Sequence, residues 1–170
     1  PLAVMRQKVN FLSIVEEIIV MSRHAVDKAN KPLIKTGVEL RNLVRNMERV
    51  PVVLGNPYKF TQLVYNLVTN ACKFTKQGSV SVCGKYLEDK SILELSVVDT
   101  GCGISKDAQH RIFKPFEQEH SNSGDSRNFQ GMGLGLAVCW EIVEQHGGSI
   151  RVESDIGKGS SFIVSLACEK

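Results

Sequence analysis

The sequence of 170 residues lacks several features that mark particular classes of protein. Its five cysteines are an odd number and include no C-x-x-C pair. This pattern favours free thiols in a reducing compartment over a disulfide framework or a zinc site. The sequence contains no secretory signal pattern and no apolar run of about 18 residues that could span a membrane. We therefore expect a domain that resides in the cytoplasm.

The sequence also lacks a large excess of either positive or negative charge. The formal net charge is +3 at pH 7, and no dense run of Lys or Arg occurs, so we expect no nucleic acid partner. Apolar residues make up 42% and charged residues 23%, as in ordinary globular proteins. The length predicts one domain over residues 1–170. Because the first residue is not Met, we expect a piece of a longer protein, for which membrane attachment stays open.

The spacing of apolar residues predicts three main helices, over residues 10–30, 57–73 and 134–146. Pro32 helps to end the first helix. Asn56 followed by Pro57 is typical of an N-cap and a first helical residue. A short fourth helix over residues 105–112 is expected to begin after Ser105.

Six segments have the composition or alternation of strands: residues 33–39, 52–54, 79–87, 91–99, 149–153 and 160–167. Residues 88–90 form a hairpin turn between the third and fourth of these segments, and the polar residues 117–130 form a loop. Helices and paired strands together predict an α/β fold, a two-layer sandwich of a mixed sheet and about three main helices.

The stretch NLVTNACKFT, residues 66–75, places a polar stripe on the second helix. Asn66 and Asn70 are four residues apart and Lys73 follows three later, so the three project from one side. The opposite side carries apolar residues at core spacing, namely Leu63, Leu67, Ala71 and Phe74. Buried amides need partners, so the stripe is either a solvated face or a binding site.

Two segments contain glycines beside predicted helix starts. In VVDTGCGIS, residues 97–105, a strand ends at Asp99, and Gly101 and Gly103 permit close approach of the backbone. A plain strand-to-helix turn with an Asp cap explains this segment equally well. In GMGLGLAV, residues 131–138, glycines at a helix start let backbone N–H groups face an anion.

A dinucleotide site is an alternative for the second glycine segment. Gly131 and Gly133 precede a helix and a strand, and Glu153 follows about 20 residues later. However, the segment before Gly131 is a polar loop rather than a strand, and Leu136 occupies the third glycine position. This interpretation is therefore disfavoured.

Taken together, the motifs resemble the catalytic, ATP-binding domain of sensor histidine kinases, most closely of hybrid kinases. NLVTNACKFT, DTGCGIS, FKPFEQ (113–118) and GMGLGLAV have the order and spacing of that family's N box, first glycine box, F box and second glycine box. GKGSSF at 157–162 is similar to its closing motif. The resemblance covers essentially the whole chain and implies the Bergerat fold, with a flexible ATP lid over about residues 117–130.

The resemblance implies a role for each motif residue. Asn70 matches a Mg²⁺ ligand and Lys73 a residue that reaches the phosphates of ATP. Phe74 matches a residue that packs against adenine, and Asp99 matches the carboxylate that accepts a hydrogen bond from the adenine amino group. The other implied nucleotide-binding residues are Asn66, Gly101, Gly103, Ile104, Arg127, Gly131, Gly133, Leu134 and Gly135.

In this family the γ-phosphate passes to a histidine on a separate dimerisation domain, which leaves ADP. Related ATPases carry Glu at the position of Asn66 as a general base, and an amide cannot accept that proton. None of the four histidines here precedes an acidic residue, as the acceptor typically does. The resemblance thus implies a kinase catalytic domain whose partners are its own dimerisation domain and a receiver domain in a homodimeric parent. A degenerate module that binds adenine nucleotide as a conformational signal is the alternative.

Overall fold

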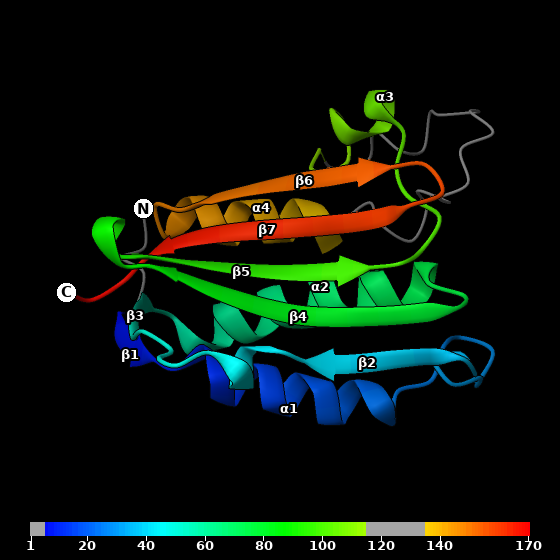
Figure 1. Cartoon of the computed structure of the whole chain (residues 1–170), viewed down its shortest axis with the longest axis horizontal. Helices are drawn as coiled ribbons and strands as arrows, with labels where there is room; N and C mark the ends of the chain where they lie inside the picture. Colours follow the sequence, from blue (N-terminus) through cyan, green and yellow to red (C-terminus); the bar gives the residue numbers. More distant parts are fainter. Residues whose placement is uncertain (1–5, 115–134) are drawn as a thin grey trace.

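A computed structural model describes residues 6–114 and 135–170, which build a five-stranded sheet with helices on one face (Figure 1). The strand order is β2 (Val38–Asn42), β4 (Gly78–Leu87), β5 (Ile92–Asp99), β7 (Gly159–Ala167) and β6 (Ser149–Asp155). β2 pairs with β4 in parallel and the other neighbours pair antiparallel, so the sheet is mixed. The predicted α/β sandwich is confirmed.

Three helices cover the inner face of the sheet: α1 (Phe11–Arg23), α2 (Pro57–Phe74) and α4 (Gly135–Gln145). Each packs against the sheet, and α2 lies between α1 and α4. Alternate residues of β5 are buried toward this helical layer, namely Leu93, Leu95, Val97 and Asp99. Among the described helices, none has the length and apolar character needed to cross a membrane.

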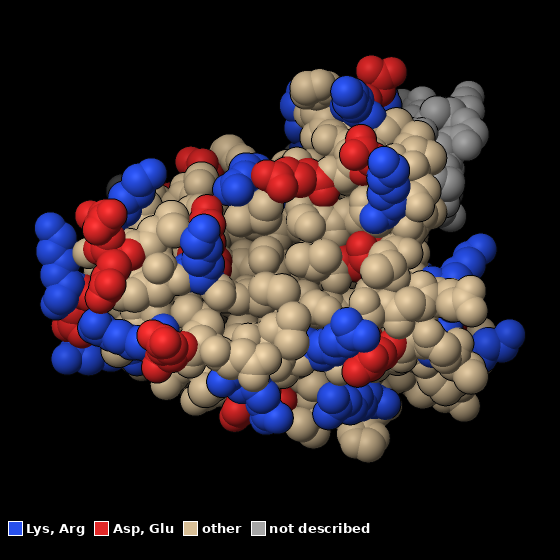
Figure 2. Space-filling model, viewed as in Figure 1, with Lys and Arg blue, Asp and Glu red and all other residues tan. Residues whose placement is uncertain are grey.

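The opposite face of the sheet is open, and Figure 2 shows it with uncharged side chains across the middle. Small residues such as Ser96 and Ser161 alternate with the buried positions of their strands. Charged residues surround this middle, and Arg151 of the edge strand β6 lies 3.7 Å, Nη1 to Oε2, from Glu94 of the central strand β5. All sequence-predicted site residues that the structure describes on α2 and α4 lie on the other side of the sheet.

The first helix is shorter than predicted. It ends at Arg23, whereas the sequence predicted an end near residue 30. The Asp27 carboxylate accepts hydrogen bonds from the backbone N–H groups of Ala29 and Lys31, at 2.8 and 3.0 Å. Asn30 adopts a left-handed conformation with φ of 62°. A side chain that binds nearby backbone donors competes with helical bonding, so the chain turns here instead of continuing the helix.

The first predicted strand is also displaced, since β2 begins at Val38 and residues 33–37 are not a strand. Gly37 has a φ of +91°, which interrupts an extended run. The predicted strand 52–54 is β3 (Val53–Gly55), and it pairs antiparallel with an unpredicted strand, β1 (Gln7–Val9). Three residues are too few for an alternation pattern, which is why β1 was missed.

The remaining strands, the turn and α4 follow the prediction closely, but the short helix is shorter than predicted. Residues 88–90 form a single 3₁₀ turn between β4 and β5. The short helix α3 (Lys106–Gln109) covers only the first part of the predicted 105–112, and the Ser105 hydroxyl caps it by accepting from the Ala108 N–H. The expected lid over 117–130 lies outside the described residues.

Candidate functional site

The helix that carries the polar stripe begins where the sequence predicts. The Asn56 side-chain oxygen accepts hydrogen bonds from the N–H groups of Tyr58 and Lys59, at 2.9 and 3.3 Å. Pro57 occupies the first helical position, where its missing N–H costs nothing. The apolar side of α2 is buried against the sheet, with Leu63, Leu67 and Ala71 each at most 1% exposed. This packing fixes the direction in which the polar stripe points.

The polar stripe opens into a pocket of about 210 Å³ between α2 and the start of α4. The lining residues are Leu33, Asn66, Thr69, Asn70, Lys73, Gly135 and Leu136. The structure therefore brings together four sequence-predicted residues: Asn66, Asn70, Lys73 and Gly135. Two amides, an ammonium and the N-terminal turn of a helix form a polar hollow suited to an anionic group.

Three lining residues were not predicted, namely Leu33, Thr69 and Leu136. Thr69 follows Asn66 by three residues and could have been found from helical spacing. Leu33 comes from the irregular segment after α1, and no pattern in the sequence places it at α2. Lys35 of the same segment donates from Nζ to the carbonyl of Lys73 at 3.0 Å and to that of Cys72 at 3.4 Å. A cation at a helix C-terminus is stabilising, so this lysine holds the end of α2 beside the pocket.

Asn70 has the environment expected of a ligand-binding amide. Its side chain is only 9% exposed, and its Nδ2 has no hydrogen-bond partner among the described residues. Rotating the amide by 180° exchanges its nitrogen and oxygen, so either atom can face the pocket. No group of three or more His, Cys, Asp or Glu that could hold a metal occurs in the described part of the chain. Asn70 fits a cation that takes one protein amide oxygen together with phosphate oxygens.

Asn66 lies one turn earlier and reaches across to α4. Burial raises the pKa of the Cys139 thiol to about 12, and a hydrogen bond from the Asn66 side chain partly opposes that effect. Cys139 Sγ also lies 3.8 Å from the Leu63 carbonyl oxygen, to which it donates. Asn66 thus lines the pocket and contacts the adjoining helix. Its amide has no basic group that could take a proton from water.

Asp99 occupies the last inward-facing position of β5, beneath the end of α2. It is 2% exposed, and its Oδ1 accepts a hydrogen bond from the Gly101 N–H at 2.9 Å. A Cβ at residue 101 would lie 2.6 Å from the Phe74 carbonyl oxygen, so only glycine fits between the loop and α2. The alternation of β5 thus places the predicted carboxylate next to the predicted helix end.

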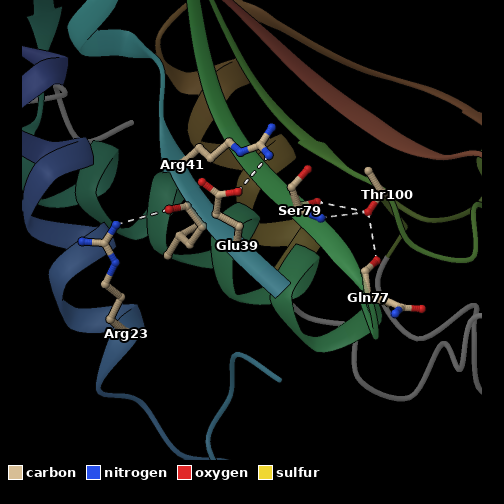
Figure 3. A network of polar contacts seen from close by, with 7 residues as sticks. Arg23, Glu39, Arg41, Gln77, Ser79 and Thr100 are labelled. Atoms are coloured by element: carbon tan, nitrogen blue, oxygen red, sulfur yellow. Dashed lines mark hydrogen bonds and ion pairs between the residues drawn. The ribbon is translucent and has the colours of Figure 1, made fainter. Parts of the chain in front are cut away.

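The loop after β5 is held on one side by Thr100 (Figure 3). Thr100 Oγ1 accepts from the Ser79 N–H at 2.9 Å and donates to the Gln77 carbonyl at 3.1 Å. These bonds join the end of β5 to the start of β4. The same view shows Arg23 of α1 reaching the Leu40 carbonyl, at 3.2 Å, which ties the first helix to β2.

The other predicted site residues have different surroundings. Ile104 is 2% exposed and belongs to the core cluster beside the 99–104 loop. Phe74 is half-buried and packs against the core, and it does not line the described pocket. Lys73 Nζ lies 5.9 Å from the centre of the Phe74 ring. Four predicted residues lie outside the described part of the chain: Arg127, Gly131, Gly133 and Leu134.

Comparison with known families agrees with this fold. Residues 55–170 match the family described as "Histidine kinase-, DNA gyrase B-, and HSP90-like ATPase". The match covers more than half of the chain, and the chain therefore belongs to this ATPase family.

Its curated relatives include histidine kinases, as the motifs suggested. "Histidine protein kinase 1" of Candida albicans is 37% identical over 145 residues, which are 84% of this chain and 6% of that protein. "Sensor histidine kinase RcsC" of Escherichia coli is 42% identical over 118 residues, which are 69% of this chain and 12% of that protein. This chain thus spans only a small part of these relatives.

Solved structures support the same fold. Full-length ShkA in complex with AMPPNP superimposes with a TM-score of 0.77 over 98% of this chain and 32% of that chain, at 24% identity. The expected Bergerat-type sandwich is consistent with this likeness.

Proposed function

We propose that this chain is the catalytic domain of a histidine kinase, which binds Mg–ATP and donates the γ-phosphate to a histidine on a separate dimerisation domain. The observation that carries the proposal is the pocket that gathers Asn66, Asn70 and Lys73 of α2 at the start of α4. Membership of the ATPase family and relatives named as histidine kinases support it.

The adenine end of the nucleotide lies at the loop after β5 in this proposal. The buried Asp99 carboxylate accepts a hydrogen bond from the adenine amino group, and the glycine at 101 lets the base approach the backbone. Guanine presents an acceptor where adenine presents this donor, so the carboxylate selects the base. A polar group left unpaired by the wrong ligand costs about 1–3 kcal/mol.

The phosphate end lies in the pocket between α2 and α4. Lys73 reaches the phosphate oxygens as a point charge, and the N–H groups at the start of α4, near Gly135, face the same anion. Asn70 supplies the amide oxygen for Mg²⁺. The metal, when bound, neutralises phosphate charge. These residues bind and orient ATP, and the acceptor histidine is the attacking nucleophile.

Asn66 distinguishes phosphate transfer from ATP hydrolysis. A water-using ATPase needs a base at hydrogen-bond distance from the attacking water, and an amide cannot accept its proton. The chain is therefore proposed to retain ATP until a histidine of the dimerisation domain docks. We further propose a cytoplasmic location, a homodimeric parent and a receiver domain as the next partner.

Phosphorylation with γ-labelled ATP tests this function. The chain alone should bind Mg–ATP, turn it over barely above background and remain unlabelled. Addition of the parent protein's dimerisation domain should yield a labelled product that is labile in acid and stable in alkali, as phosphohistidine is. Rapid hydrolysis by the chain alone, abolished in Asn70→Ala, would instead identify a water-using ATPase.

A degenerate module that binds nucleotide only as a conformational signal is the second candidate. It predicts ATP binding by this chain but no labelled histidine even in the complete parent protein. Labelling of the complete parent therefore separates the two functions.

A further inference from the structure

The end of β6 is bonded to the loop that follows β5 through the hydroxyl of Ser154. Ser154 Oγ accepts from the Ile104 N–H at 2.8 Å and donates to the Gly159 carbonyl at 2.7 Å. It also lies 2.8 Å from Ser160 Oγ. A serine hydroxyl has one donor and two acceptor sites. Because its proton is directed to Gly159, the Ser160 hydroxyl is the donor to Ser154, and every site on Ser154 is used.

Other contacts join the same two segments. The Gln109 side-chain amide, at the end of α3, donates to the carbonyls of Ile104 and Ser154 at 2.8 and 2.9 Å. The Gly157 N–H donates to the Cys102 carbonyl at 2.8 Å. The end of β6 and the turn after it therefore contact the loop at Cys102 and Ile104.

The backbones of the two segments also touch. Gly103 has a φ of +78°, and a Cβ there would lie 2.1 Å from the Asp155 carbonyl oxygen. The loop from Asp99 to Ile104 is thus held between β4, through Thr100, and the end of β6, through Ser154. A small shift of that strand end would move the backbone on which the proposed adenine contact depends.

We propose that Ser154 is a positioning residue for base selection: it holds the Gly103–Ile104 backbone at a fixed distance from the Asp99 carboxylate. This inference rests on the proposed ATP-binding function. Ser154 acts through Ile104 and makes no contact with the base itself. Without its hydroxyl, the Ile104 N–H loses its acceptor and the loop gains alternative positions, in which the preference for adenine is weaker.

The test uses the 170-residue chain with Ser154→Ala, and with Ser154→Thr as the variant that keeps the hydroxyl. Ser149→Ala, at the exposed start of the same strand, is the matched control. Calorimetry with ATP and GTP measures selectivity. We expect Ser154→Ala to weaken ATP binding by roughly three- to tenfold, the worth of one hydrogen bond, and to leave GTP binding unchanged. Ser154→Thr should restore the ATP preference, and Ser149→Ala should retain it.

Amide hydrogen exchange supplies a readout that a general loss of stability would not imitate. Exchange of the Ile104 N–H should become faster in Ser154→Ala, whereas exchange of the Leu95 N–H in the middle of β5 should stay slow. If Ser154→Ala does not fold, Gln109→Glu decides by the same measurements, because a carboxylate cannot donate to the two carbonyls.

The outcomes distinguish a failure of the Ser154 positioning role from a failure of the proposed ATP-binding function. Wild-type chain that does not bind ATP overturns the proposed function and the inference with it. Wild-type chain that prefers ATP, together with an unchanged ATP-to-GTP ratio in a folded Ser154→Ala or Gln109→Glu variant, overturns the positioning role alone.

Discussion

The imidazole of His146 accepts a hydrogen bond from the backbone N–H of Asn56, with 3.1 Å between Nε2 and the nitrogen. His146 directly follows α4, and Asn56 is the N-cap of α2, so this bond joins the two helices that border the candidate phosphate pocket. The other ring nitrogen, Nδ1, donates to the Ile142 carbonyl at 2.7 Å. The ring also packs on Phe60, with centroids 4.3 Å apart.

This relationship predicts that His146→Ala destabilises the fold. The substitution removes the ring packing and leaves the half-buried Asn56 N–H without its acceptor, so we expect a loss of about 2–4 kcal/mol in the free energy of unfolding. Chemical denaturation provides the measurement. His110→Ala, at an exposed position, is the control and should change stability by less than about 0.5 kcal/mol. Equal effects of the two substitutions would contradict a structural role for His146.

Asp99→Asn should weaken binding of both ATP and ADP while the fold stays intact. An amide of the same size presents only one acceptor, and it places a donor where the adenine amino group also donates. The expected loss is on the order of 1–3 kcal/mol for each nucleotide. Calorimetry measures it, with Asp89→Asn in the exposed turn after β4 as control. Wild-type affinity in a folded Asp99→Asn variant would remove the adenine assignment.

Asn70→Ala should abolish the effect of magnesium on ATP binding. Because the amide interacts with a charged ligand, we expect the binding free energy of ATP with magnesium to become less favourable by on the order of 2 kcal/mol. Titrations with magnesium and with a chelator measure the effect. The control is Gln62→Ala, an exposed position on the same helix. An unchanged magnesium effect in Asn70→Ala would place the metal on other residues.

The same variant should also keep its stability. The Asn70 Nδ2 is buried without a partner among the described residues, so folding gains nothing from it. Removing an unpaired buried polar group is neutral or stabilising. A variant that unfolds more readily than the wild type would show that Asn70 serves the fold rather than a ligand.

The buried thiols predict how stability changes at high pH. Burial raises the pKa of Cys72 to about 11 and that of Cys139 to about 12, from an ordinary value of 9.0. Between pH 9 and 11 the unfolded chain loses these protons and the folded chain keeps them, so stability falls as pH rises. Each thiol contributes up to about 1.4 kcal/mol per pH unit in this window.

Cys139→Ala tests this dependence. Denaturation of the wild type and of the variant at pH 8, 9, 10 and 11 should show a shallower loss of stability in the variant. The two proteins share all other titrating groups, so the difference between their slopes isolates Cys139. Parallel curves would contradict the raised pKa.

The parts of the fold that could be predicted rest on patterns with a local physical cause. Asn56 and Pro57 specify the start of α2 because the cap needs only residues adjacent in sequence. The alternation of β5 places Asp99 on the inner face for the same reason. The helical spacing of Asn66, Asn70 and Lys73 sets one polar face. All these features lie within single elements.

The parts that were missed depend on contacts between distant segments. The segment with Leu33 and Lys35 reaches the end of α2 across more than 35 residues of sequence, and no local pattern encodes that contact. The early end of α1 depends on the Asp27 side chain, whose bonds to the backbone compete with helical propensity. Ser154 was not predicted for a similar reason, because its three partners come together only in the folded chain.

Because Asp99 points inward, the candidate site depends on the in–out alternation of side chains along β5. Asp99 shares its face of β5 with Leu93, Leu95 and Val97. The same two-residue alternation therefore determines both the buried core positions and the position of the proposed base contact. Deletion of a single residue between Leu95 and Asp99 would point the carboxylate at the open face shown in Figure 2. Changes of length in this strand can therefore preserve the site only when they come in pairs.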